Sequence, residues 1–378
     1  MKIGILTQPL MNNYGGLLQN YALQTVLKEM GHEVYTLDRD VAKPAHLKCA
    51  SIIKYSLHRL SGDKRRIRRW MTAKEKNIIS QNTHPFIENY IQKTSKVTTT
   101  KELRKLHETY KFDVYIVGSD QVWRPQYSPC ISNYFLDFIP VNDPAKRIAY
   151  AASFGVDDWE FTRKETSLAK SLIKKFDSIS VREDSAVNLC KQYFLVDAIK
   201  TADPTLLLNR EAYEQLITHN DIKQSDGNLF VYILDKNPQK EYFIQKIANT
   251  YGFKPFRVMP TVDFLSSRKH NIHDSIFPPV EKWIRGFMDA DFVITDSFHG
   301  TIFSTIFNKP FFTLGNEERG STRITSLLKM FSLEDRFITN MGKKLPNLSF
   351  TPDNYKNIKL QTEKIRKKSI DFLRKSIE

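Results

Sequence analysis

The sequence predicts an α/β protein made of two doubly wound, Rossmann-like halves, and three observations lead to this prediction. Short apolar runs typical of buried parallel strands alternate with longer segments whose apolar residues recur at helical spacing. The alternation begins at residue 2 and, after a break near residue 207, begins again at residue 228. The length of 378 residues is also more typical of two domains than of one.

The first predicted domain, residues 1–207, opens with a strand over residues 2–7 and a helix from residue 17 to residue 30. Between them the sequence NNYGG predicts a loop. Gly15 and Gly16 would let a ligand approach the backbone there, although an ordinary strand-to-helix turn explains these residues equally well. Because the motif is not GxGxxG, it does not indicate a dinucleotide.

A second strand at residues 33–37, an insertion and three more strands complete this domain. Residues 42–100 are basic and loosely patterned, which indicates a helical insertion on the sheet. Buried strands follow at residues 112–117, 148–152 and 177–181, because each is a short apolar run that ends in polar residues.

The second predicted domain, residues 208–350, repeats the alternation of strands and helices. Its strands are expected at residues 228–234, 254–258, 292–296 and 311–314. The remaining residues, 351–378, form a basic amphipathic helix that we expect to pack back across both domains. Two doubly wound domains that face each other across a cleft describe a glycosyltransferase-B-like architecture.

The chain is strongly basic, with a formal net charge of +15, and such a charge attracts phosphate-bearing partners. Much of it lies in two runs, KRRIRR at residues 64–69 and KIRKK at residues 364–368. Solvated helix faces are the commonest explanation of such runs, and contact with an anionic membrane is the second. Neither run accompanies a recognised nucleic-acid motif, so no nucleic-acid partner is expected.

The three cysteines lie far apart and without metal-ligand spacing. This pattern fits a reducing compartment and predicts neither a disulfide framework nor a metal site. No apolar run reaches the roughly 20 residues that cross a bilayer, and the first residues are too polar beyond Leu10 for a secretory signal. We therefore expect a cytoplasmic protein, with peripheral contact at the inner face of the cell membrane as a further hypothesis.

Charged and titratable residues follow several of the predicted strands. His299 lies after the strand at residues 292–296, beside the start of a helix whose free N–H groups favour an anion. Arg182 follows the strand at residues 177–181, and Arg319 follows the next strand after His299. These residues could form an anion site with its own acid.

Ordinary structural roles remain open for the same residues. The turn at His299 could be a capping turn that carries a surface histidine. Arg182 could form a salt bridge with Glu183, Asp184 or Asp203.

A second polar group follows the strand at residues 112–117. In the sequence GSDQVW, Asp120 and Gln121 could hydrogen-bond a sugar, and Trp123 could offer an aromatic face for stacking. The alternative is an ordinary polar loop with the tryptophan packed inward.

Four motifs, taken in order, carry a resemblance to a known family. They are NYGGLLQNYALQ, VGSDQVW, ISVRED followed by ADPTLLL, and TDSFHGTIFS with NKPFF. In this order and spacing the chain resembles the polysaccharide pyruvyl transferase family over nearly its whole length. The resemblance implies transfer of the pyruvyl group of phosphoenolpyruvate, as a cyclic ketal, to a hexose of a surface polysaccharide or its lipid-linked precursor. Phosphate is released, and no cofactor or metal is required.

The resemblance also implies roles for individual residues. His299 would be the general acid that protonates the CH2 of the donor. Arg182 and Arg319 would bind the donor anion, and Arg319 stands where many members have a lysine. Many members have an arginine where this chain has Ser297, and we hypothesise that Arg323 replaces that lost donor. The full donor-binding set is Arg182, Arg319, Ser297, Gly300 and Arg323.

The acceptor sugar is assigned to the two loops of the first domain. These residues are Asn13, Tyr14, Gly15, Gly16, Ser119, Asp120, Gln121 and Trp123.

Two other functions are compatible with the sequence. One is a glycosyltransferase of the same architecture that uses a nucleotide-sugar, although no glutamate is placed convincingly for binding its ribose. The other is a basic protein that binds nucleic acid or an anionic membrane without catalysis.

Overall fold

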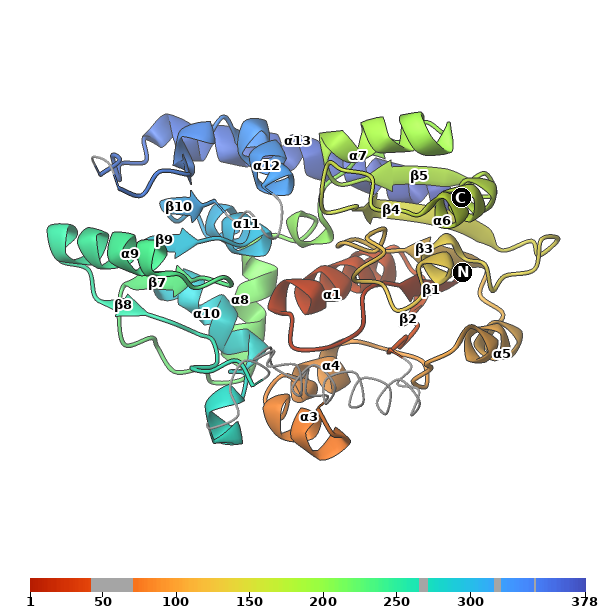
Figure 1. Ribbon diagram of the computed structural model, residues 1–378, viewed down its shortest axis with the longest axis horizontal. Helices are drawn as coiled ribbons and strands as arrows, with labels where there is room; N and C mark the ends of the chain where they lie inside the picture. Colours follow the sequence, from red (N-terminus) through yellow and green to blue (C-terminus); the bar gives the residue numbers. More distant parts are fainter. Residues whose placement is uncertain (42–70, 265–270, 316–320, 343–344) are drawn as a thin grey trace, which may run out of the picture.

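The computed structural model describes residues 1–41, 71–264, 271–315, 321–342 and 345–378. These residues form two α/β domains, each built on a fully parallel sheet (Figure 1). Within each sheet the strand order reverses once, which is the mark of doubly wound topology. The predicted fold class is confirmed.

The sheet of the first domain has six strands in the order β2-β1-β3-β4-β5-β6. Its strands are β1 (Lys2–Leu6), β2 (Glu33–Thr36), β3 (Val114–Val117), β4 (Lys146–Ala152), β5 (Ser178–Val181) and β6 (Ile199–Lys200). Its helices are α1 (Tyr14–Glu29), α3 (Ala73–Ile79), α4 (His84–Tyr90), α5 (Thr100–Tyr110), α6 (Arg163–Ile173) and α7 (Asp184–Leu189), with the shorter turns η1 (Ile131–Phe135), η2 (Cys190–Phe194) and η3 (Pro204–Leu206). The strand order reverses between β1 and β3, so ligands are expected beyond the carboxyl ends of these two strands.

The sheet of the second domain has five strands in the order β11-β10-β9-β7-β8. Its strands are β7 (Leu229–Tyr232), β8 (Pro255–Phe256), β9 (Phe292–Thr295), β10 (Phe311–Leu314) and β11 (Phe337–Ile338). The helices are α8 (Arg210–His219), α9 (Pro238–Tyr251), α10 (Val280–Asp289), α11 (Phe298–Ile306) and α12 (Thr322–Phe331), with the turns η4 (Ile272–Ser275) and η5 (Glu334–Arg336). Here the order reverses between β7 and β9, and α11 follows β9 directly.

Two helices begin earlier than their apolar spacing predicts. Helix α1 starts at Tyr14 because the Asn13 side chain accepts a hydrogen bond from the Gly16 backbone N–H. Helix α11 starts at Phe298 because Ser297 caps it in the same way. The capping side chains satisfy N–H groups of the first turn and offset the low helical propensity of glycine there. As a result, most of the predicted NNYGG loop is the first turn of a helix.

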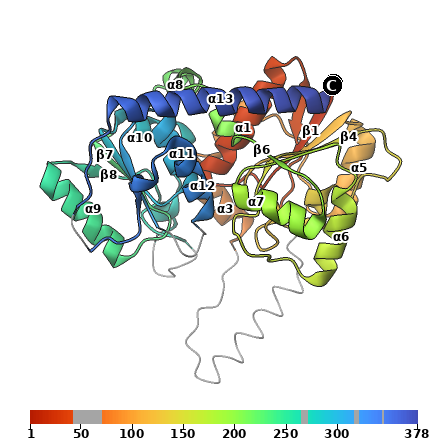
Figure 2. The ribbon, with the colours of Figure 1, turned by 90° about the horizontal axis from the view of Figure 1, so that it is seen from above.

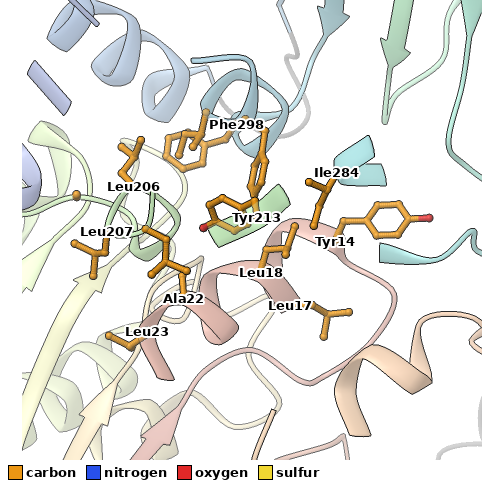
Figure 3. Packing of buried hydrophobic residues seen from close by; sticks show 14 of the residues in the cluster. Tyr14, Leu17, Leu18, Ala22, Leu23, Leu206, Leu207, Tyr213, Ile284 and Phe298 are labelled. Carbon is orange, nitrogen blue, oxygen red and sulfur yellow. The ribbon is translucent and has the colours of Figure 1, made fainter. Parts of the chain in front are cut away.

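The two domains share one apolar core. A single cluster of buried residues contains side chains of both sheets. Figure 3 shows its central part, where Leu18 of α1, Leu206 of η3 and Phe298 of α11 gather around Tyr213 of α8. The domains therefore meet through close packing of buried side chains, which holds the strand ends of the two sheets in fixed positions relative to each other.

The C-terminal helix α13 (Pro352–Ile377) runs along both domains (Figure 2). Arg366 donates hydrogen bonds to two carbonyls of the chain between the domains, those of Leu206 (2.8 Å) and Leu208 (2.9 Å). Nearer its end, Ser369 accepts from the Ala202 N–H at 2.8 Å. The basic residues Lys364, Lys367 and Lys368 of this helix are exposed.

The predicted insertion is described only from residue 71 onward, so the KRRIRR run at residues 64–69 lies outside the described residues. The described part of the insertion, which includes α3 and α4, contacts the second domain. Ile79 accepts a hydrogen bond from the Phe277 N–H at 3.0 Å, and Asn82 donates to the Phe277 carbonyl at 3.0 Å. Within the described ranges, no helix combines the length and apolar character that a bilayer crossing requires.

A buried ion pair fixes the end of β9. Lys240 Nζ donates to Asp296 Oδ2 at 2.7 Å, and both side chains are almost completely buried. Asp296 also accepts from the backbone N–H groups of Leu234 (2.7 Å) and Asp235 (3.1 Å). These bonds tie the carboxyl ends of β7 and β9 together directly beneath α11.

We expect Lys240→Met to lower the free energy of unfolding by about 3–5 kcal/mol, because it leaves the Asp296 carboxylate buried without its cation. Urea denaturation measures the loss. Lys236→Met is the matched control, since Lys236 is exposed and lies four residues earlier. Equal stability of the two variants would show that the pair does not hold this strand end.

Candidate functional site

The His299 side chain extends from the second domain to contact the first. It lies in the first turn of α11, and its ring packs against Gly15 in the first turn of α1. A β-carbon on Gly15 would lie 2.1 Å from His299 Nδ1 and 2.2 Å from its Cγ, so only glycine allows this contact. The histidine side chain is 8% exposed. It is therefore a buried interdomain residue and not a surface histidine.

Asp203 joins residues from both domains. Its Oδ2 accepts hydrogen bonds from Arg182 Nη1 (2.7 Å) and Ser119 Oγ (3.2 Å). The same oxygen lies 3.5 Å from His299 Nε2. Its Oδ1 accepts from the backbone N–H and the hydroxyl of Thr205, at 3.0 and 2.7 Å. Both oxygens of this carboxylate are thus occupied by close contacts.

The electrostatic environment keeps Asp203 ionised. Burial alone would raise the pKa of this carboxyl, but His299 and Arg182 outweigh burial and hold the pKa well below its usual range. The ionised carboxylate in turn holds the Arg182 guanidinium in a fixed position.

Arg182 is buried and surrounded by carboxylates. Its Nη2 lies 3.5 Å from Asp120 Oδ1, and its Nε lies 3.8 Å from Glu183 Oε2. The guanidinium carbon lies 4.3 Å from the centroid of the Phe298 ring. Burial opposes ionisation of Arg182, yet Asp203, Asp120 and Glu183 raise its pKa above the ordinary value.

Several buried polar atoms of this cluster lack a hydrogen-bond partner among the described residues. They are Arg182 Nε, Arg182 Nη2, His299 Nε2 and Glu183 Oε2. An unsatisfied buried polar atom costs roughly 1–3 kcal/mol, so folded proteins seldom keep several of them together without a function. Since Nη1 is bound to Asp203, the remaining Nε and Nη2 form the edge of the guanidinium that binds an anion through two hydrogen bonds.

The Glu183 carboxylate offsets part of the positive charge of Arg182. Its Oε1 accepts from Ser153 Oγ (2.8 Å) and from the Phe154 N–H (3.1 Å). Burial raises the pKa of Glu183, although Arg182 opposes that shift. Glu183 therefore takes up a proton more readily than an exposed glutamate does.

A pocket lies between the domains beside Arg182. Arg182, Lys200 and Asp203 line it from the first domain, and Phe298 and Arg323 line it from the second. Leu206, Ile302 and Leu327 supply its apolar wall. Among the described residues, His299 does not line this pocket, but it shares Asp203 with it. The pocket therefore combines guanidinium groups of both domains with an apolar wall.

Arg323 is the second guanidinium of the pocket. It is buried in the first turn of α12, and its guanidinium carbon lies 5.8 Å from the centroid of the Phe298 ring. Burial and then the charge of Arg182 lower the pKa of Arg323 to about 10. An anion placed between the two guanidinium groups would relieve this repulsion.

The other predicted donor residues have structural roles or lie outside the description. Ser297 caps α11 by accepting from the Gly300 N–H at 3.4 Å. A β-carbon on Gly300 would lie 2.2 Å from Thr295 Oγ1, so this glycine lets α11 approach β9 closely. Arg319 belongs to residues 316–320, which are outside the described residues.

The predicted acceptor residues divide into two groups. Ser119, Asp120 and Asn13 belong to the site, since Asn13 Nδ2 lies 3.5 Å from Asp120 Oδ2. Gln121 instead accepts a hydrogen bond from Arg124 Nη1 at 3.0 Å. Gly16 lies in the first turn of α1 beside the capping side chain of Asn13.

The expectation that Trp123 stacks on a sugar is not met. Its side chain is fully buried and stacks on Phe135, with ring centroids 5.4 Å apart and planes at 6°. Its indole N–H donates to the Tyr134 carbonyl at 3.0 Å. Trp123 is a core residue of the first domain, which was the alternative interpretation.

Tyr14 is likewise buried, and it joins the two domains. Its ring stacks on Trp283 of α10 at a centroid distance of 5.5 Å. Its hydroxyl donates to the Pro278 carbonyl at 2.9 Å. This tyrosine therefore holds α1 against the second domain, and its ring faces protein on both sides.

Sequence reasoning identified Asp203 only as a salt-bridge partner of Arg182 and did not identify Glu183 or Phe298 as site residues. The sequence signal at Asp203 is the motif ADPTLLL, which carries part of the family resemblance. Its role depends on contacts with residues far away in the chain. Within the described ranges, no group of three or more histidine, cysteine, aspartate or glutamate residues is placed to hold a metal ion.

We expect Gly15→Ala to lower the free energy of unfolding by about 1–3 kcal/mol, because its β-carbon overlaps the His299 ring. Gly16→Ala is the matched control: the nearest atom to its β-carbon, Asn13 Nδ2, is 3.1 Å away and ends a flexible side chain. Urea denaturation of both variants measures the difference. If Gly15→Ala is as stable as the control, the close contact between Gly15 and His299 is wrong.

Solved structures with a similar fold include a glycotransferase of kitacinnamycin, with 12% identity, a TM-score of 0.50, and coverage of 100% of this chain and 99% of that one. S. aureus MnaA in a co-structure with UDP has 12% identity and a TM-score of 0.50, with coverage of 96% and 87%. A UDP-GlcNAc 2-epimerase from Neisseria meningitidis bound to UDP-GlcNAc has 10% identity and a TM-score of 0.49, with coverage of 98% and 94%. At these identities the likeness concerns the glycosyltransferase-B-like fold alone.

No curated protein sequence matches the chain. The family model described as polysaccharide pyruvyl transferase matches residues 13–318, from the residue that caps α1 to beyond β10, and so includes Asp203 and His299 but neither Arg319 nor Arg323. The chain belongs to the polysaccharide pyruvyl transferase family.

Proposed function

We propose that this protein transfers the pyruvyl group of phosphoenolpyruvate, as a cyclic ketal, to two hydroxyls of a hexose and releases phosphate. The acceptor is a surface polysaccharide or its lipid-linked precursor, and phosphoenolpyruvate is the only co-substrate in the proposal. The observation that carries it is the meeting of His299 and Arg182, from different domains, on the single carboxylate of Asp203.

His299 is the general acid in this reaction. The enol ether carbon becomes electrophilic when its CH2 is protonated, and an imidazolium is an acid strong enough for this step near neutral pH. The Asp203 carboxylate, 3.5 Å from Nε2, holds the ring in position. Nε2 contacts Asp203 only at the long distance of 3.5 Å and makes no hydrogen bond to the described residues, so a bound substrate can approach this nitrogen.

Arg182 and Arg323 bind the donor anion. The unsatisfied Nε and Nη2 of Arg182 accommodate a carboxylate or a phosphate through two hydrogen bonds. Arg323 lines the same pocket from the second domain and replaces the arginine that many members carry at the position of Ser297. Arg319 is a further donor ligand in this proposal, on the basis of the family resemblance.

The proposal predicts phosphate release that depends on phosphoenolpyruvate and on a hexose acceptor, together with a mass gain of one pyruvyl ketal on that acceptor. His299→Asn lowers this rate by about 10²–10⁴-fold, because it removes the acid. His107→Asn is the matched control, since His107 also contacts a carboxylate, Asp143, at 3.0 Å but lies apart from the site. Equal activity of the His299 and His107 variants would refute the assigned acid.

The same preparation separates this function from a nucleotide-sugar-dependent glycosyltransferase. Phosphoenolpyruvate should raise the unfolding temperature of the protein, whereas UDP- and GDP-sugars should not. Stabilisation by a nucleotide-sugar alone, without phosphate release from phosphoenolpyruvate, would favour the glycosyltransferase.

Arg323→Leu should raise the KM for phosphoenolpyruvate by about 10–100-fold, which corresponds to the loss of one charge-assisted hydrogen bond of about 1.5–3 kcal/mol. Arg323→Lys should recover part of the loss because it keeps the charge. Lys329→Leu is the control, since Lys329 is an exposed cation on the same helix. An unchanged KM in Arg323→Leu would exclude this arginine from donor binding. Steady-state phosphate release over a range of phosphoenolpyruvate concentrations measures the effect.

A further inference from the structure

Three carboxylates surround Arg182, and two of them, Asp203 and Asp120, differ in how completely their oxygens are occupied. Asp203 accepts from Arg182, Ser119 and twice from Thr205, all at 2.7–3.2 Å. Asp120 has only two long contacts, 3.5 Å from Oδ1 to Arg182 Nη2 and 3.5 Å from Oδ2 to Asn13 Nδ2. An ionised carboxylate has about four acceptor positions, so Asp120 keeps capacity for another donor, whereas Asp203 has little.

The backbone of Asp120 is held in an unusual conformation. Its φ is +70°, in the left-handed region that non-glycine residues seldom adopt. The Asp120 carbonyl accepts from the backbone N–H groups of Val122 (2.7 Å) and Ser153 (3.2 Å), and the residue forms an isolated bridge with Ala152. These contacts fix the strained residue directly after β3, where the strand order of the first sheet reverses. Such strain persists where the surrounding structure enforces it, and it is common at active sites.

Asp120 and His299 are linked indirectly, through residues that contact one or the other. Asn13 contacts the Asp120 carboxylate and caps the first turn of α1. Gly15, in the same turn, packs against the His299 ring. Arg182 reaches Asp203, the partner of His299, with Nη1 and reaches Asp120 with Nη2. The acid and Asp120 are therefore linked through one guanidinium, with the unsatisfied Nη2 on the side of Asp120.

The proposed reaction needs a proton acceptor as well as an acid. The donor CH2 gains one proton from His299 and becomes a methyl group. The adjacent carbon, which bears the phosphate, forms a bond to the first sugar oxygen, and that hydroxyl loses its proton. The C–O bond to phosphate then breaks, the second hydroxyl forms the second C–O bond, and its proton leaves with the phosphate. One proton is thus transferred from the first hydroxyl to a protein group during the first addition, and it must return to His299 before the next cycle.

We propose that the Asp120 carboxylate accepts the proton of the first attacking sugar hydroxyl. This inference rests on the proposed function and assigns the base that the reaction requires. Asp120 suits the role because it is fixed in position, has free acceptor positions, and lies beside the cation that binds the donor. Asp203, which has similar chemistry, is the positioning residue for His299 and Arg182.

Asp120→Asn tests the assignment, because asparagine keeps the shape and tolerates the left-handed backbone but is a poor base. We expect kcat for phosphate release to fall at least about 100-fold, while the affinity for phosphoenolpyruvate, measured by calorimetry, stays within about threefold (~0.6 kcal/mol). Asp221→Asn is the matched control, since Asp221 also has a positive φ, +47°, and is exposed.

The outcomes separate the inference from the proposed function. If the wild-type protein releases no phosphate from phosphoenolpyruvate with any hexose acceptor, the proposed function and this inference both fail. If the wild-type protein is active and Asp120→Asn retains its kcat, or loses donor affinity in parallel with kcat, only the inference fails. If Asp120→Asn does not unfold cooperatively, Asp120→Gly decides: glycine fits the backbone, added formate should restore part of the rate, and no restoration overturns the assignment.

Discussion

The buried contact of Asp203 with Arg182 and His299 is the constraint on which the rest of the site depends. An ionised carboxylate in the interior is stable only when cations and hydrogen-bond donors surround it, and Asp203 receives them from both domains. The contact therefore does more than hold two side chains. It links the carboxyl ends of the two sheets and holds the imidazole beside a buried carboxylate.

The fold provides the rigidity that this contact needs. His299 and the Gly15 backbone against which it packs lie in the first turns of two helices, each started by a capping side chain. The apolar core continues from one domain into the other, and α13 hydrogen-bonds the segment between them. Groups on rigid elements are placed more accurately than groups on loops, and each of these elements is anchored on buried side chains.

The sequence predicts most of this architecture because apolar runs and helical spacing depend on local patterns. Strand β10 has the bounds that the sequence predicts, whereas β6 and β11 have two residues each and are too short to form a pattern. The first turns of α1 and α11 were predicted as a loop and a turn because glycine disfavours helices. Sequence spacing alone does not show that Asn13 and Ser297 offset that preference.

The site was predictable only in part, since its contacts join distant residues. His299 and Arg182 stand at strand ends, which the pattern locates. Asp203 meets Ser119 across 84 residues of chain, and Trp123 packs on Phe135 inside the core, and neither contact follows from local sequence.

The charge of the site also depends on contacts between residues far apart in the chain. Asp120, Glu183 and Asp203 surround Arg182, so net positive charge does not make this site attract an anion. Its attraction comes from Nε and Nη2 of Arg182, which make no hydrogen bond to the described residues, and from the guanidinium of Arg323 in the same pocket.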